Sequence, residues 1–189
     1  MNCSMLHPNR IRWLALAALF VLGGPSVVVL ATEPPGHDVD HPAIRVSARI
    51  VVWLWPWAAA LPFVGRSIAL RWVHTLGAAL CVLHVAVAFH LGHGWSHAAA
   101  FEHTERVAGF GPGVFVNDFF VALWIAESLA AWLDFDRYLK RPRWLRVAIV
   151  SFMGFIVLNA GVVFASGPWR WVALAAFVLP WFVLRRRAR

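Results

Sequence analysis

The sequence predicts an all-α membrane protein, a single bundle of about six transmembrane helices. Composition is the first reason, because 61% of the 189 residues are hydrophobic and 14% are charged, whereas soluble domains are about 45–50% apolar and about 25% charged. Six apolar runs are the second reason. The third is that most basic residues border these runs, as topology signals do. Membrane topology therefore explains the net charge of +8, and we expect no nucleic-acid partner.

Each expected span is an apolar run bounded by polar or turn-forming residues. The first run is longer than the 7–15 residues of a typical signal-peptide core, so we interpret residues 1–31 as a retained first span or signal anchor, with a cleaved signal peptide as the alternative. Pro56 is expected to kink the second span. The runs cover residues 13–31, 46–64, 72–92, 114–133, 147–165 and 169–184.

The connections between the spans are read from their polar composition. Residues 32–45 form an external linker whose prolines and glycine argue against a helix. Residues 98–113 are predicted to be a loop because they end in GFGPG. Residues 46–184 make up the five-helix remainder, and 185–189 form a basic tail.

The basic residues also predict the orientation. With the N-terminus inside, thirteen of the 17 Lys and Arg residues fall on the cytoplasmic side, in agreement with the positive-inside rule. Both termini are then cytoplasmic, and we expect a bacterial inner membrane location. Cys3 is cytoplasmic and Cys81 intramembrane, so a disulfide framework is not expected. The thirteen are Arg10, Arg12, Arg66, Arg71, Arg137, Lys140, Arg141, Arg143, Arg146, Arg185, Arg186, Arg187 and Arg189.

A histidine-rich stretch at the outer end of the third span is the main functional signal. On a straight helix, His90, His93 and His97 share one stripe about 10 Å long. His93 and His97 have the i,i+4 spacing that presents two imidazoles to one metal, and imidazole suits Zn, Cu or Fe. Since a straight helix rarely supplies three ligands to one ion, we predict that at least two of these histidines converge with a ligand from elsewhere.

Three further residues could complete that metal site from the same side of the membrane: Glu102, His103 and Asp118. Gly92 and Gly94 flank His93, and glycine weakens a helix interior by about 1 kcal/mol relative to alanine. If the helix breaks there, the shared-face argument lapses. The competing interpretation is that these histidines only line the membrane interface.

Polar residues inside the spans are a second signal, because such groups are costly in lipid and are functional by default. His84 and Glu127 are predicted to lie at comparable depth and to face the bundle, as a possible pair or proton relay. Asn159 is a candidate partner for His84. Glu127 could instead snorkel from near the end of its span.

Haem b is the alternative cofactor. His84 and His97 lie thirteen residues apart, close to the spacing by which one helix of a b-type cytochrome holds two haems. The other spans contain no histidine, so an electron-transfer subunit of this kind would need an unusual second ligand or a partner subunit. A third alternative is a structural subunit of a membrane complex, or a homo-oligomer, without its own cofactor. The sequence identifies neither a substrate nor catalytic residues.

Three sequence motifs together resemble an uncharacterised family of His-rich bacterial multi-pass membrane proteins. They are HVAVAFHLGHGWSHAAAFEHTER, the pair Asn117 and Asp118, and VLNAGVVFASGP. The likeness covers residues 68–171 and implies no known activity. HLGHGWSH is also similar to one histidine box of membrane desaturases, but a single cluster supplies too few ligands for their di-iron site.

Overall fold

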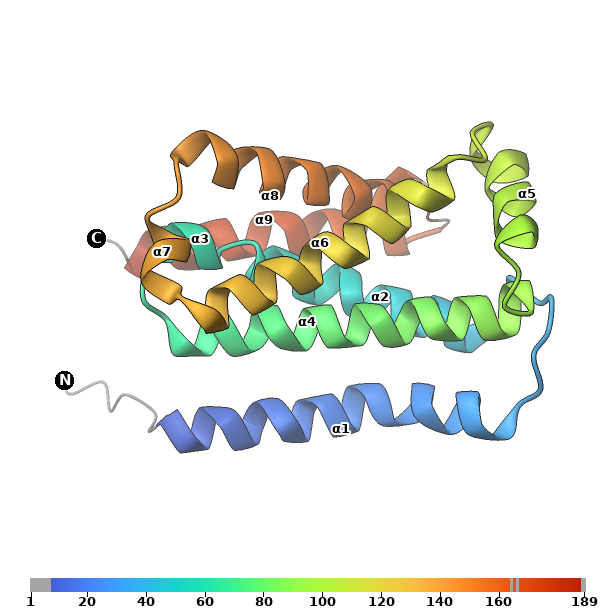
Figure 1. The fold of residues 1–189 in the computed structure, drawn as a ribbon, viewed down its shortest axis with the longest axis horizontal. Coiled ribbons are helices and arrows are strands. Elements are labelled where there is room, and N and C mark those ends of the chain that lie inside the picture. Colours follow the sequence, from blue (N-terminus) through green and yellow to red (C-terminus); the bar gives the residue numbers. More distant parts are fainter. Residues whose placement is uncertain (1–7, 164, 166, 188–189) are drawn as a thin grey trace.

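The computed structural model describes residues 8–163, 165 and 167–187, which form an all-helical bundle without strands (Figure 1). The prediction of an all-α fold is thus confirmed. The elements are α1 (Pro8–Thr32), α2 (Pro42–Ala58), α3 (Leu61–Val64), α4 (Ile68–Val87), the π-helix η1 (Ala88–Gly92), α5 (His97–Ala108), α6 (Gly113–Leu133), α7 (Phe135–Leu139), α8 (Arg143–Leu158), the π-helix η2 (Asn159–Val163) and α9 (Trp169–Arg187).

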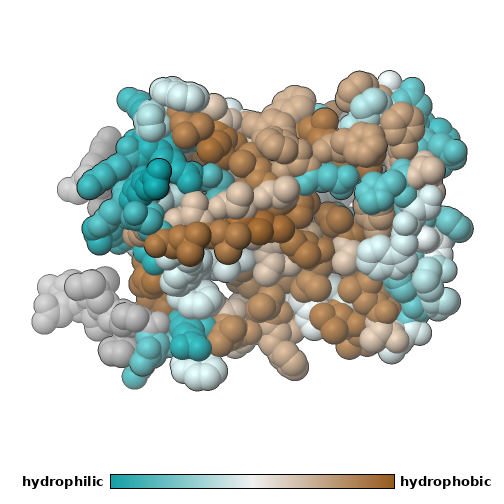
Figure 2. Space-filling view, in the orientation of Figure 1, coloured by the Kyte–Doolittle hydropathy of each residue, from teal (hydrophilic) through white to brown (hydrophobic). Residues whose placement is uncertain are grey.

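Five described helical segments are long and apolar enough to cross a membrane. The sixth expected span is α9, whose apolar stretch Trp169–Leu179 is shorter. Large apolar side chains cover the outside of the bundle, including Phe20 at 80% exposure, and they form a brown band between two hydrophilic ends (Figure 2). Such a surface is compatible with a membrane protein. The five segments are Asn9–Thr32, Pro42–Val64, Ile68–Gly92, Gly113–Leu133 and Arg143–Val163.

Helix α4 lies at the centre of the bundle, where it contacts α1, α2 and α6. It approaches α6 closely at Gly77, where a Cβ atom would lie 2.6 Å from Cζ2 of Trp124. The missing side chain lets the indole pack directly against the α4 backbone. Trp124 is 1% exposed and belongs to the main apolar core with Trp55 of α2.

The bundle has two chemically different ends. One end of the bundle holds the start of α1, the end of α9, and the short helices α3 and α7 (Figure 1); we call it the arginine end. The connection between α1 and α2 lies at the other end, with η1 and α5 (Figure 1); we call it the histidine end. The arginine end carries Arg66, Arg137, Lys140, Arg141, Arg143 and Arg146, whereas the histidine end carries His37, His41, His90, His93, His97 and His103.

The predicted loop at 98–113 is wrong, because most of it is helix α5. Ser96 caps this helix by accepting a 3.2 Å hydrogen bond from the Ala99 amide. Gly109 ends it at a φ of 67°, a left-handed conformation that glycine adopts readily. Pro56 lies inside α2, which continues to Ala58. The second expected span is divided only after that residue, where a separate short helix, α3, begins at Leu61.

The helix that carries the histidine stripe does break at the flanking glycines. α4 passes into η1 and the helix ends there; Gly94 and Trp95 then take φ values of 55° and 62°. His93 lies in this turn and His97 begins α5. The three histidines therefore do not lie on one face of a single helix.

Candidate histidine site

His90 is held by hydrogen bonds at both ring nitrogens. Nδ1 accepts from the Trp95 indole at 3.0 Å, so the ring hydrogen is on Nε2, which donates to the Glu33 carbonyl at 2.8 Å. The side chain is buried. An imidazole with both nitrogens engaged has none left for a metal, so the assignment of His90 as a ligand is not supported by its geometry.

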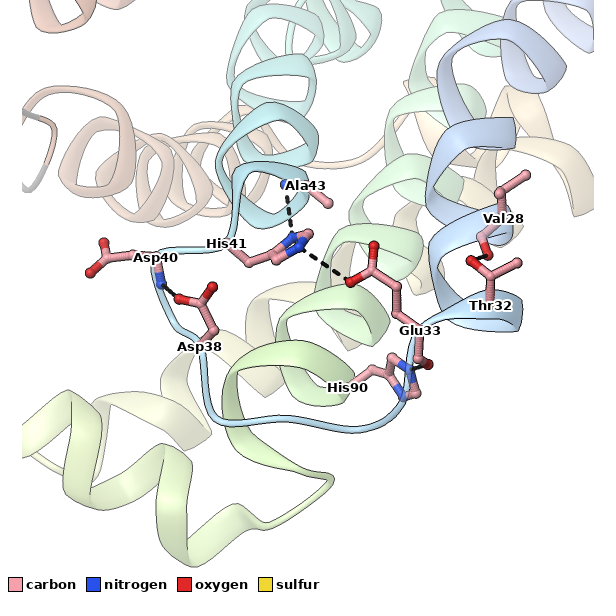
Figure 3. A network of polar contacts seen from close by, with 8 residues as sticks. All are labelled: Val28, Thr32, Glu33, Asp38, Asp40, His41, Ala43 and His90. Carbon is pink, nitrogen blue, oxygen red and sulfur yellow. Dashed lines mark hydrogen bonds and ion pairs between the residues drawn. The ribbon is translucent and has the colours of Figure 1, made fainter.

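The η1 turn binds the connection between α1 and α2 through its carbonyl groups. Gly36 donates its amide to the His90 carbonyl at 2.8 Å, and Asp38 donates to the Leu91 carbonyl at 2.9 Å. Oε2 of Glu33 also lies 3.2 Å from Nε2 of His41, so Glu33 contacts both His41 and His90 (Figure 3). The segment predicted to be an external linker is thus fastened to the end of α4.

His93 and His103 are the two predicted ligands that the structure brings together. Their ring centroids are 5.4 Å apart, with His93 in the turn after η1 and His103 on α5. Burial lowers the pKa of His93 below its ordinary 6.5, and the neighbouring His103 and His37 lower it further. Three imidazoles therefore lie within electrostatic range, although His37 was not among the predicted ligands.

His37 reaches this position because residue 94 has no side chain. A Cβ atom on Gly94 would lie 3.0 Å from Cε1 of His37 and 3.4 Å from Nε2. The positive φ of Gly94 is a second reason for glycine there. The sequence carried a signal for this contact, since HDVDH contains ligand types, but only the η1 hydrogen bonds bring that segment to the turn.

The remaining predicted ligands contact other side chains or lie away from the pair His93 and His103. His97 faces Asp118 of α6, with 3.6 Å between Nε2 and Oδ2, and both side chains are exposed. Glu102 is exposed on α5. Within the described residues, no group of three or more His, Cys, Asp or Glu side chains is arranged to hold a metal ion. The predicted convergence of His90, His93 and His97 is thus replaced by the pair His93 and His103.

The predicted buried polar residues are separated along the bundle. His84 is 3.0 Å from the Ser47 hydroxyl through Nδ1. Glu127 lies beside Ser128, whose hydroxyl contacts His74 at 2.9 Å. Since His74 and His84 are ten residues apart, about 15 Å along a helix, the expected comparable depth of His84 and Glu127 is wrong.

Glu127 does face the bundle, as predicted, because it is 8% exposed. Its partner is Arg141, with 2.5 Å between Oε1 and Nη1, and not His84. Asn159 is only half-buried and donates to the Phe155 carbonyl of its own helix at 2.7 Å. The haem alternative receives no support from its two residues, because His84 contacts Ser47 and His97 is exposed beside Asp118.

The sequence did not identify the polar cluster around Glu127. Tyr138 of α7 hydrogen-bonds to Glu127; burial raises the pKa of this phenol, and the Glu127 charge raises it further. The Arg141 guanidinium lies 4.8 Å from the centre of the Tyr138 ring. In the sequence, Arg141 is only a topology signal. Several basic residues follow α6, and their order does not show which of them turns its side chain into the bundle.

Comparisons with protein-family models, with curated proteins and with solved structures find no match to this chain. The resemblance to a family of His-rich membrane proteins therefore stays an expectation.

Proposed function

We propose that this protein is a multi-pass membrane protein that binds a transition-metal ion at its histidine end, for metal handling or redox chemistry. One observation carries the proposal, the 5.4 Å separation of the His93 and His103 rings. Metal–nitrogen bonds of about 2.0–2.1 Å in tetrahedral geometry place two bound imidazole rings roughly 5 Å apart, centre to centre. The two side chains therefore already have the spacing of a chelating pair.

His37 is the proposed third ligand. Its ring packs beside Gly94, the neighbour of His93, and its exposure leaves it free to turn toward the pair. His90 supports this arrangement without being a ligand, because it fastens the connection that carries His37. A site with three imidazoles and an open position is the kind that binds Zn, Cu or Fe with a further water or substrate.

Metal binding to purified protein tests this proposal. Equilibrium titration with Zn²⁺ or Co²⁺ should give one site per chain in the wild type, and His93→Ala or His103→Ala should weaken it at least tenfold. His97→Ala is the matched control, since His97 is an exposed histidine of the same end that pairs with Asp118. Binding that is absent in the wild type, or equally affected by all three substitutions, would favour a structural subunit without a cofactor.

We further propose six membrane crossings, with the arginine end in the cytoplasm and the histidine end outside. The start of α1 and the end of α9 at one end of the bundle (Figure 1) and the basic residues there support this orientation. Glu102 and Lys140 are exposed at opposite ends. In cells carrying Cys3→Ser, an impermeant thiol reagent should label Glu102→Cys and not Lys140→Cys. The reverse pattern would reject the orientation.

A further inference from the structure

A small cavity lies inside the bundle toward the arginine end. Its volume is about 20 Å³, and roughly 10–15 Å³ suffices for one water molecule. The lining combines apolar side chains with five polar ones from four helices: His74 of α4, Trp124 and Glu127 of α6, Tyr138 of α7 and Arg146 of α8. A cavity with several polar groups on its wall differs from genuinely empty cavities, whose walls are apolar.

Two of the lining side chains carry buried donors that need an acceptor. Within the described part of the chain, Nε1 of Trp124 and Nε of Arg146 are buried and have no hydrogen-bond partner. Trp124 is 1% exposed. Leaving a buried donor unsatisfied costs about 1–3 kcal/mol, and more than nine in ten buried polar groups in proteins avoid this cost.

The charges around the cavity favour a neutral ligand. Glu127 places a carboxylate on the wall and Arg146 a guanidinium, so the two charged side chains that line the cavity are opposite in sign. Arg146 already donates through Nη1 to the Pro62 carbonyl at 2.7 Å. A water oxygen accepts two hydrogen bonds, and a carboxylate on the same wall is an acceptor for its protons.

We propose that this cavity binds one water molecule, which accepts hydrogen bonds from Trp124 Nε1 and Arg146 Nε and donates to Glu127. Such a water typically makes about three hydrogen bonds. It joins α6 to α8 and extends the Tyr138, Arg141 and Glu127 network into the centre of the bundle. This site is independent of the proposed metal site, which lies at the opposite end.

Ultraviolet resonance Raman difference spectroscopy can test this on the full chain. The wild-type spectrum minus that of Trp124→Phe isolates one indole among the twelve tryptophans. The matched control is Trp132→Phe, because Trp132 Nε1 donates to Thr75 Oγ1 at 2.8 Å and so provides a bonded reference. We expect Trp124 to give the hydrogen-bonded N–H signature of Trp132, whereas a free N–H signature would overturn the proposal.

A measurement on the wild type covers the case in which Trp124→Phe does not fold. An experimental density map should contain a peak within about 3.2 Å of Trp124 Nε1 and also near Arg146. An empty cavity would overturn the proposal. So would an anomalous peak at that position from protein grown in bromide, because it would identify a halide site in place of a water site.

Discussion

The two ends of the bundle hold their polar groups in different ways. At the arginine end, Glu127 and Arg141 form a buried ion pair, closed in by Tyr138. At the histidine end, His37 is exposed and His93 and His103 are half-buried, and backbone hydrogen bonds to η1 place the segment that carries His37. The first arrangement makes stability depend on the pair, while the second leaves His93 and His103 with freedom to bind. This contrast supports the proposal of ligand binding at the histidine end and of a structural role for the ion pair at the arginine end.

The largest expected loss of stability comes from breaking the ion pair at the arginine end. Glu127→Ala leaves the Arg141 charge partly buried without its partner, and removing one member of a buried pair typically costs about 3–5 kcal/mol. Reversible unfolding in detergent should show a loss of unfolding free energy near the lower limit of that range, since Arg141 is 24% exposed. Glu102→Ala, an exposed carboxylate at the other end, should change little. Equal effects would remove the contrast between the ends.

His90→Leu should cost less, about 2 kcal/mol, because the Trp95 indole and the Glu33 carbonyl both lose their partner. His97→Leu removes only an exposed pair with Asp118, so it should cost under about 1 kcal/mol. The same unfolding assay measures both. If His97→Leu were the more costly, the assignment of His90 as the anchor of the α1–α2 connection would be wrong.

Gly94→Ala should have a smaller effect on stability and a specific one on the site. A side chain at the positive φ of Gly94 costs about 1 kcal/mol, and its Cβ would displace the His37 ring. We therefore expect weaker Zn²⁺ binding together with a small fall in the unfolding midpoint. Gly109→Ala is the control, since Gly109 also has a positive φ but no neighbour within 4 Å of the added Cβ. Equal losses of affinity would exclude a role for His37.

The smallest expected effect is a change in the pKa of His93. The pKa of His93 lies below 6.5 because of burial and of His103 and His37. His103→Gln removes one of these positive neighbours, so the pKa of His93 should rise toward 6.5 in an NMR titration, whereas His97→Gln should leave it unchanged. Because the unfolded chain binds this proton more readily, the folded state loses stability as pH falls below about 6.5. A pKa that falls in His103→Gln would contradict this electrostatic account.

The all-helical fold and the long spans could be predicted because apolar length is a local property of the sequence. The polar helix α5 was not predicted even though Ser96 and Gly109 mark its ends, because it has no long apolar run and GFGPG follows it directly. The histidine site was predicted only in part. His93 and His103 were named, but the contact that brings in His37 depends on hydrogen bonds between segments distant in sequence, from Gly36 and Asp38 to η1.

Pulsed electron paramagnetic resonance of bound Cu²⁺ tests the central claim most directly, since it counts the imidazoles on the metal. We predict at least two coordinating imidazoles in the wild type, one fewer in His103→Gln and in His93→Gln, and an unchanged count in His90→Gln and His97→Gln. A spectrum without imidazole nitrogen, or a count that falls in His97→Gln and not in His103→Gln, would contradict a metal site built on His93 and His103.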